Sequence, residues 1–144
     1  MTLFLDTNVV IAACVEEHEH HTRALPLLQS VHTGVNDGCV SGHGILEVYA
    51  ILTRLPRAPR ILPGQAAALV EENILKHFAT ITLTAKEYGE LTSKLGRNGV
   101  LGGQAYDVLH LECAEKSDAD RIYTFNVRHF ASLAPHLTGR IAAP

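Results

Sequence analysis

The first ten residues restrict the fold more than any other stretch of the chain. A short, mostly apolar run, Thr2-Leu3-Phe4-Leu5, ends in Asp6, and polar Thr7 and Asn8 then lead into Val9-Val10-Ile11-Ala12-Ala13. This pattern predicts a buried strand, a tight turn and a helix opened by a capping residue. In open α/β sheets, ligands bind outside the carboxyl ends of the strands. Asp6 therefore either caps the helix or belongs to a binding site at that edge.

The length and composition of the chain indicate one domain, residues 1–144, with a substantial apolar core. No apolar run approaches the roughly 20 residues that cross a bilayer. The N-terminus lacks a basic segment, which is unlike a secretory signal, and three scattered cysteines without CxxC spacing indicate reduced thiols. We therefore expect a cytoplasmic protein without a membrane segment. With a net charge of −3, it must bind any nucleic acid through a local basic patch or metal ions.

Short apolar strands alternate with amphipathic helices along the whole chain. The expected strands cover residues 2–5, 39–40, 79–83 and 121–125, with a possible edge strand at 139–142. The expected helices cover residues 8–15, 24–31, 42–55, 64–77, 85–95, a segment with Asp107 in its first turn, and a short last helix opened by Asn126. Strands separated by helices pair in parallel through right-handed crossovers. The sequence therefore predicts an α/β fold with a parallel sheet of four to five strands.

Four polar positions gather at the carboxyl edge of this predicted sheet. Asp6 and Asn126 follow strands, while Glu47 and Asp107 belong to helices that begin near the same edge. Carboxylates brought close together raise one another's pKa unless a cation neutralises them. Oxygen ligands favour Mg²⁺ or Mn²⁺ over Zn²⁺. The alternative for each acid is a helix cap or an ion pair, and for Asn126 a plain capping role.

Other side chains have both a functional and a structural interpretation. Thr7, Asn8 and Thr124 could orient the acids from a second shell, although hydroxyls and amides at strand ends also cap helices. Arginines recur every three residues just past the helix that carries Glu47: Arg54, Arg57 and Arg60. They could bind phosphates, or they could simply be solvated in a proline-rich loop.

Histidines add two further options near the acids. His43 and His110 lie one helical turn from Glu47 and Asp107 and could act as a ligand or a proton carrier, although the chemistry requires neither. The run from Glu16 to His21 could hold a metal but is more typical of a solvated corner.

Four short motifs, in this order, resemble those of a known family. They are Leu5-Asp6-Thr7-Asn8-Val9, Leu46-Glu47-Val48, Tyr106-Asp107-Val108-Leu109-His110 and Thr124-Phe125-Asn126-Val127-Arg128-His129-Phe130. Together they resemble the PIN-domain ribonucleases and, in size and layout, the VapC-type toxins of toxin–antitoxin pairs. The chain departs from many members at one position, because Asn126 stands where they carry an aspartate.

The resemblance implies a three-layer α/β/α fold and metal-dependent RNA cleavage that leaves 5′-phosphate and 3′-hydroxyl ends. It also implies a homodimer and a small antitoxin partner. We expect Asp6 and Asp107 to ligate Mg²⁺ directly and Glu47 to bind through the metal or a water. One rival is a non-catalytic scaffold of the same fold that binds RNA or protein. The other is a phosphohydrolase of small substrates, and the lack of a GxxxxGK loop argues against a nucleoside-triphosphate enzyme.

Overall fold

A five-stranded parallel sheet forms the centre of the molecule. The computed structural model describes residues 1–144, and its strands have the order β3-β2-β1-β4-β5. In chain order they are β1 (Thr2–Leu5), β2 (Asp37–Ser41), β3 (Phe78–Ile81), β4 (Arg121–Tyr123) and β5 (Ile141–Ala142). In the centre, Phe4 lies opposite Cys39 on one side and Ile122 on the other. The prediction of a parallel sheet, including its edge strand, is confirmed.

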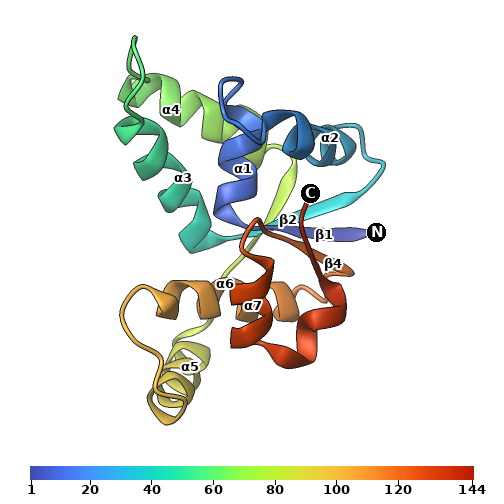
Figure 1. Cartoon of the computed structure of the whole chain (residues 1–144), viewed down its shortest axis with the longest axis vertical. Coiled ribbons are helices and arrows are strands. Elements are labelled where there is room, and N and C mark those ends of the chain that lie inside the picture. The colour runs from blue at the N-terminus through green and yellow to red at the C-terminus, as the bar shows by residue number, and fades with distance from the viewer.

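Helices cover both faces of this sheet and complete three layers (Figure 1). One layer contains α1 (Thr7–Cys14), α2 (His21–His32), α3 (Gly42–Arg54), α4 (Pro63–Val70) and the π-helical turn η1 (Glu71–Leu75). The other contains α5 (Ala85–Arg97), α6 (Gln104–Lys116), α7 (Val127–Leu133) and the 3-10 helix η2 (Pro135–Arg140). None of these helices is long and apolar enough to cross a membrane.

The two helical layers bury different numbers of apolar residues against the sheet. The layer that contains α1 to α4 shares a core of 19 buried apolar residues with the sheet, whereas the opposite core has 14. Helix α5 buries only Leu91. Polar contacts with α6 help to hold it, with Lys94 Nζ 2.5 Å from Glu112 and Lys116 Nζ 2.8 Å from Glu87. The chain has no disulfide, in agreement with the prediction of free thiols.

Two local predictions differ from the structure. The helix expected at 64–77 ends at Val70 and widens into η1, where the Lys76 N–H bonds to the Glu71 carbonyl five residues earlier. Helix α1 begins at Thr7, because Asp6 itself is the capping residue. Asp6 thus has the structural role that the sequence offered as the alternative to a site. The carboxyl ends of β1, β2 and β4 lie at one edge of the sheet, where α1, α3 and α6 begin (Figure 1).

Candidate active site

Asp6 is the buried acid at the centre of this edge. Its Oδ1 accepts the Thr7 N–H at 2.8 Å, and its Oδ2 accepts the Thr124 hydroxyl at 2.8 Å. Burial raises the pKa of the Asp6 carboxyl, and the negative charge of Asp107 adds to this rise. The hydrogen bonds and the field of His110 act in the opposite direction and only reduce the shift. Asp6 is therefore fixed in orientation, and negative charge on it is costly.

Glu47, on α3, is joined to Asp6 through Thr7 and is held by its neighbours. Its Oε1 accepts a hydrogen bond from His110 Nε2 at 2.5 Å and another from the Thr7 hydroxyl at 3.2 Å, and His43 Nε2 lies 3.7 Å away. Burial raises the pKa of Glu47, but the hydrogen bond and charge of His110 outweigh it, so the pKa is lowered. Thr7 therefore links the two acids, since its N–H binds Asp6 and its hydroxyl binds Glu47.

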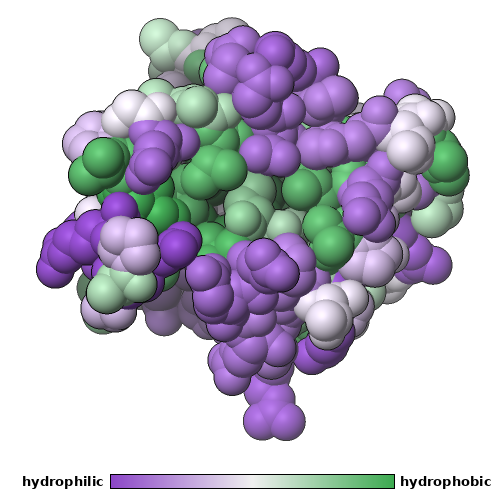
Figure 2. Space-filling view, turned by 90° about the horizontal axis from the view of Figure 1, so that it is seen from above, coloured by the Kyte–Doolittle hydropathy of each residue, from purple (hydrophilic) through white to green (hydrophobic).

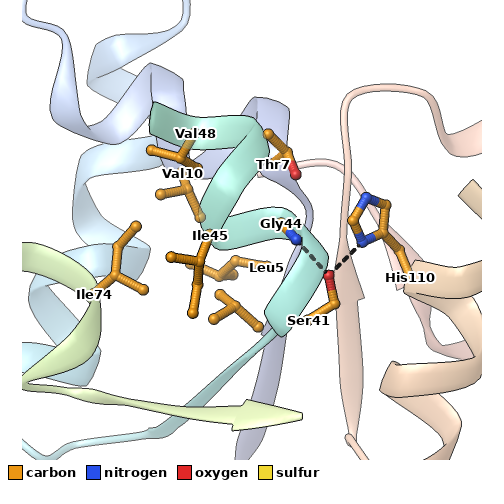
Figure 3. Close-up of a pocket in the computed structure, with 10 residues that line it drawn as sticks. Leu5, Thr7, Val10, Ser41, Gly44, Ile45, Val48, Ile74 and His110 are labelled. Carbon is orange, nitrogen blue, oxygen red and sulfur yellow. Dashed lines mark hydrogen bonds between the residues drawn. The ribbon is translucent and has the colours of Figure 1, made fainter. Parts of the chain in front are cut away.

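His110 is buried, and each of its ring nitrogens has a polar partner. Figure 3 shows the contact with Ser41. His110 Nδ1 lies 2.7 Å from the hydroxyl oxygen of Ser41, which also accepts the Gly44 N–H at 2.9 Å. A neutral imidazole with its proton on Nε2 satisfies every group, because Ser41 then donates to Nδ1 and His110 donates to Glu47. A Cβ on Gly44 would lie 3.0 Å from the Ser41 oxygen and 3.3 Å from that of Thr7. Only glycine leaves this contact undisturbed.

The third acid, Asp107, lies in the first turn of α6, as the sequence predicts. Its Oδ2 is 3.0 Å from Nε2 of His129, which belongs to α7. About one third of each side chain is exposed to solvent. Asp107 is close enough to Asp6 to raise its pKa. Each of the two helix-borne acids, Glu47 and Asp107, thus has a histidine partner.

Asn126 and Asn8 take different positions at this edge. Asn126 precedes α7, yet its side chain makes no capping hydrogen bond; its backbone N–H donates to the Thr124 hydroxyl at 3.0 Å, and its carbonyl accepts the Phe130 N–H. The exposed amide therefore has no role as a cap. Asn8 accepts the Phe125 N–H at 3.5 Å and contacts none of the acids. Of the three second-shell candidates, the structure brings Thr7 and Thr124 to the acids, and it does not bring Asn8 there.

The three predicted RNA-binding arginines lie at the other end of α3. Arg54 is in its last turn, and Arg57 and Arg60 belong to the loop between α3 and α4, which Figure 1 shows at the end of α3 that lies away from the sheet. Arg57 pairs with Glu17 at 3.2 Å. The structure gives these arginines no contact with the acid edge, and their part in RNA binding stays a prediction.

Some residues of the site were not singled out by sequence reasoning. Ser41 holds the Nδ1 side of His110, His129 contacts Asp107, and Tyr106 stacks on His43 with ring centroids 4.5 Å apart. Their positions in the sequence could have indicated them, because Ser41 directly follows a predicted strand, Tyr106 precedes an acid, and His129 follows Asn126 by one helical turn.

The donor set fits a hard divalent cation in its chemistry. Asp6, Glu47 and Asp107 offer only carboxylate oxygens, which Mg²⁺ and Mn²⁺ prefer. Burial, and to a smaller extent the charge of Asp107, raises the pKa of Asp6, and a bound cation would offset this cost of ionising it. Nevertheless, no three His, Cys, Asp or Glu side chains converge closely enough to form a metal site, and the run from Glu16 to His21 forms none either. Glu47 and Asp107 are directed to histidines and must turn toward Asp6 to complete one.

The parallel sheet between two helical layers, with acids at its carboxyl edge, places the protein among three-layer α/β/α proteins. Comparison with known proteins identifies its family. The PIN-domain family model matches residues 3–134. The chain therefore belongs to the PIN-domain family, and the family resemblance of its motifs is confirmed.

Its relatives include two ribonucleases named VapC. The chain is 33% identical to Ribonuclease VapC40 of Mycobacterium tuberculosis over 104 residues, 72% of each protein. It is 33% identical to Ribonuclease VapC27 of the same organism over 107 residues, 74% of this chain and 72% of the relative. The fold is similar to that in the crystal structure of VapBC2 from Rickettsia felis bound to a DNA fragment from their promoter. This match has a TM-score of 0.62 and 22% identity, and covers 93% of this chain and 94% of the other.

Proposed function

We propose that this protein is a divalent-metal-dependent endoribonuclease and the toxin of a toxin–antitoxin pair. The observation that carries the proposal is the linked set of acids at the carboxyl edge. Thr7 joins Asp6 to Glu47, and Asp107 acts electrostatically on Asp6. The family and the two VapC ribonucleases similar to this chain support the same activity. The alternative of a scaffold without activity gains nothing from a site whose three acids are all present.

Asp6, Asp107 and Glu47 would hold Mg²⁺ or Mn²⁺, with the exposed amide of Asn126 at the edge. When bound, the metal supplies an activated water and stabilises charge on the phosphoryl group. The protein supplies the orientation. Thr124 fixes the Asp6 carboxylate, and Thr7 and His110 fix that of Glu47. We expect hydrolysis of RNA to leave 5′-phosphate and 3′-hydroxyl ends.

An antitoxin is the protein partner that we infer, because relatives of this chain are VapC ribonucleases and a similar fold occurs in a VapBC complex. The side of the molecule with the α3–α4 loop offers a suitable surface. Figure 2 shows apolar side chains at the bottom of a hollow ringed by hydrophilic ones. On this side, a hollow of about 420 Å³ lies between the end of α1, the loop at Arg57–Ile61 and α4.

A homodimer is the second assembly that we propose. It would cover large apolar side chains that α3 and its connection to α4 expose, Leu46 and Leu62 among them. Sedimentation at tens of micromolar that shows only a 15.6 kDa species would argue against it. We also infer that a toxin acting on cellular RNA works in the cytoplasm.

The activity is tested with purified protein and a 3′-labelled single-stranded RNA that carries a 5′-hydroxyl, with Mg²⁺ and with excess EDTA. We expect cleavage with the metal only, and products that a 5′-phosphate-dependent exonuclease degrades. Cleavage that persists in EDTA would remove the metal from the proposal. No cleavage of total RNA under any divalent metal would favour the scaffold.

A further inference from the structure

Two stacked aromatic rings lie directly beside the acids. The rings of His43 and Tyr106 are 4.5 Å apart and almost parallel, with an interplanar angle of 6°. His43 comes from the first turn of α3, four residues before Glu47, and its Nε2 lies 3.7 Å from the Glu47 carboxylate. Tyr106 directly precedes Asp107 on α6. The two helices that bring these acids to the edge therefore also bring the two rings together.

Tyr106 is held in place and yet open to solvent. One face of its ring lies on His43, while 51% of the residue is exposed. Its hydroxyl makes no hydrogen bond with the protein, so no internal polar contact explains its position. By contrast, Tyr88 on α5 is exposed to a similar degree, 46%, but stacks on no ring. A flat, supported and half-exposed aromatic ring is suited to receive a second planar group.

We propose that Tyr106, supported by His43, is a stacking platform for one unpaired nucleobase of the RNA that the acids cleave. The inference rests on the proposed function and specifies its substrate as single-stranded or looped RNA. Bases within an A-form duplex are stacked on both faces, whereas bases of single strands are free to stack on protein rings. His43 contacts both the Tyr106 ring and Glu47. The phosphate attached to a base on the platform would therefore lie close to the acids.

The platform also fits the charge of this edge. Base stacking needs no positive charge, whereas three carboxylates repel the RNA backbone, and the predicted arginines lie at the far end of α3. A neutral aromatic surface adds affinity for a nucleobase that does not depend on the charge of this edge. The competing use of an exposed tyrosine is a contact with another protein chain, but such a contact gives no reason for a ring stacked against a neighbour of Glu47.

A fluorescent variant tests the contact directly. The chain contains no tryptophan, so Y106W introduces a single one at the platform and Y88W introduces one on α5 as the matched control. Both are combined with Asp6→Asn so that RNA stays intact. Oligouridine and oligoadenosine should quench the fluorescence of the Y106W protein and leave that of the Y88W protein unchanged. An abasic ribose-phosphate oligomer and a blunt RNA duplex should quench neither. Equal quenching by the abasic oligomer would overturn the platform.

Affinity measurements with the natural residue as reference complete the test. Tyr106→Phe should bind oligouridine as the wild type does, whereas Tyr106→Ala and Tyr106→Leu should bind about ten- to a hundredfold more weakly. In cleavage, the alanine variant should raise KM more than it lowers kcat, and Tyr88→Ala should change neither. If Tyr106→Ala changes the sedimentation behaviour but not RNA affinity, the ring is a protein contact and the inference is wrong.

The two proposals can fail separately. If the wild type does not cleave RNA but base-dependent quenching persists, base stacking on Tyr106 is supported and the proposed ribonuclease activity is wrong. If the wild type cleaves RNA and Tyr106→Ala has the wild-type KM, the ribonuclease activity is supported and the stacking role of Tyr106 is wrong.

Discussion

The strand-borne and helix-borne acids of this edge are held in opposite ways. Asp6, at the end of β1, is buried and receives neutral donors, the Thr7 N–H and the Thr124 hydroxyl. Glu47 and Asp107, on α3 and α6, are partly exposed and each contacts an imidazole. The pKa of Asp6 is raised by its burial. The pKa of Glu47 is lowered because His110 outweighs burial.

Because of this difference, one acid of the site is fixed in position and the other two are free to turn. Asp6 caps α1, and moving it would break the start of a helix. Glu47 and Asp107 stand on helices α3 and α6 and contact histidine side chains, so that turning either acid away from its histidine would break no backbone hydrogen bond. We infer that Asp6 is the fixed reference of the site and that the two outer acids close around a metal.

The largest effect should come from the fixed acid. Asp6→Asn keeps a side chain that can cap α1, but it removes the charge at the centre of the site. We expect RNA cleavage to fall by more than about a hundredfold. Stability in metal-free buffer should change by less than about 1 kcal/mol, because relief of buried charge offsets a poorer contact with Thr124. Cleavage rates and urea unfolding measure the two effects.

Asp118→Asn is the control for this substitution. Asp118 is exposed and has a φ of 52°, a conformation that asparagine tolerates. It loses the same charge far from the acids and should cleave RNA normally. Wild-type cleavage by the Asp6→Asn protein would end the metal-nuclease proposal, and loss of its fold would make Asp6 a structural cap alone.

The next largest effect should come from the histidine that holds Glu47. His110→Ala removes the donor 2.5 Å from Glu47 and leaves the Ser41 hydroxyl without its partner. We expect cleavage per folded molecule to fall by about ten- to a hundredfold. We also expect a loss of about 2–4 kcal/mol in unfolding free energy, because His110 is buried.

His136→Ala is the matched control, since His136 contacts Glu115 on the exposed surface, where its own side chain is 54% exposed. That change should leave both quantities nearly unaltered. If His110→Ala lowers stability but not the cleavage rate of the folded fraction, His110 supports the fold and does not position Glu47.

The fold was readable from the sequence because its signals are local. The apolar run at residues 2–5 and the β-forming stretch at 121–125 predicted two central strands, and Thr84 with Glu87 predicted the start of α5. The end of α4 was not readable. The widening into η1 inserts an extra residue per turn without any proline or glycine between Val70 and Phe78, so the apolar pattern alone suggested a continuous helix.

The acids of the site were predictable, but their contacts were not. Asp6, Glu47 and Asp107 stood out because carboxylates in apolar surroundings need a reason. The pairing of Glu47 with His110 joins residues 63 positions apart, and its geometry depends on how α6 packs on the sheet. The arginines at 54, 57 and 60 had suggestive spacing, but the direction of α3 carries them away from the edge.

A smaller effect should appear in the pH dependence of stability in metal-free buffer. Because the folded-state pKa of Glu47 is lowered, its carboxylate stabilises the fold above its ordinary pKa of 4.5, and this stabilisation is lost as the pH falls through the folded value. Glu47→Gln should therefore cost about 0.5–1.5 kcal/mol at pH 7 and less in acid. Urea unfolding at several pH values provides the measurement.

Asp6 should behave with the opposite sign. Its pKa is raised in the folded state, so its charge opposes folding above that pKa, and this penalty disappears as the pH falls toward the ordinary value of 3.8. Asp6→Asn removes this charge, so the part of its effect on the unfolding free energy that comes from the charge should become smaller as the pH falls. Parallel pH profiles for Asp6→Asn and Glu47→Gln would show that the two acids are not held differently.

The smallest expected effect concerns the exposed amide of Asn126. Its side chain caps nothing, so Asn126→Asp should leave the start of α7 intact while adding a fourth carboxylate near the edge. Without metal, repulsion from the other acids should lower the melting temperature by a degree or two, about 0.5 kcal/mol. With Mg²⁺, the added charge should increase affinity and therefore the metal-induced rise in melting temperature.

The comparison of melting temperatures with and without Mg²⁺ decides whether Asn126 lies at the metal's edge. Ser132→Asp is the control, because Ser132 lines the same surface hollow as Asn126 but belongs to the end of α7. A larger metal-induced rise in Asn126→Asp than in either the wild type or Ser132→Asp supports a position beside the metal. Equal rises in all three proteins would place Asn126 outside the site. The fixed acid Asp6 and the two adaptable acids would then make up the whole of its carboxylate set.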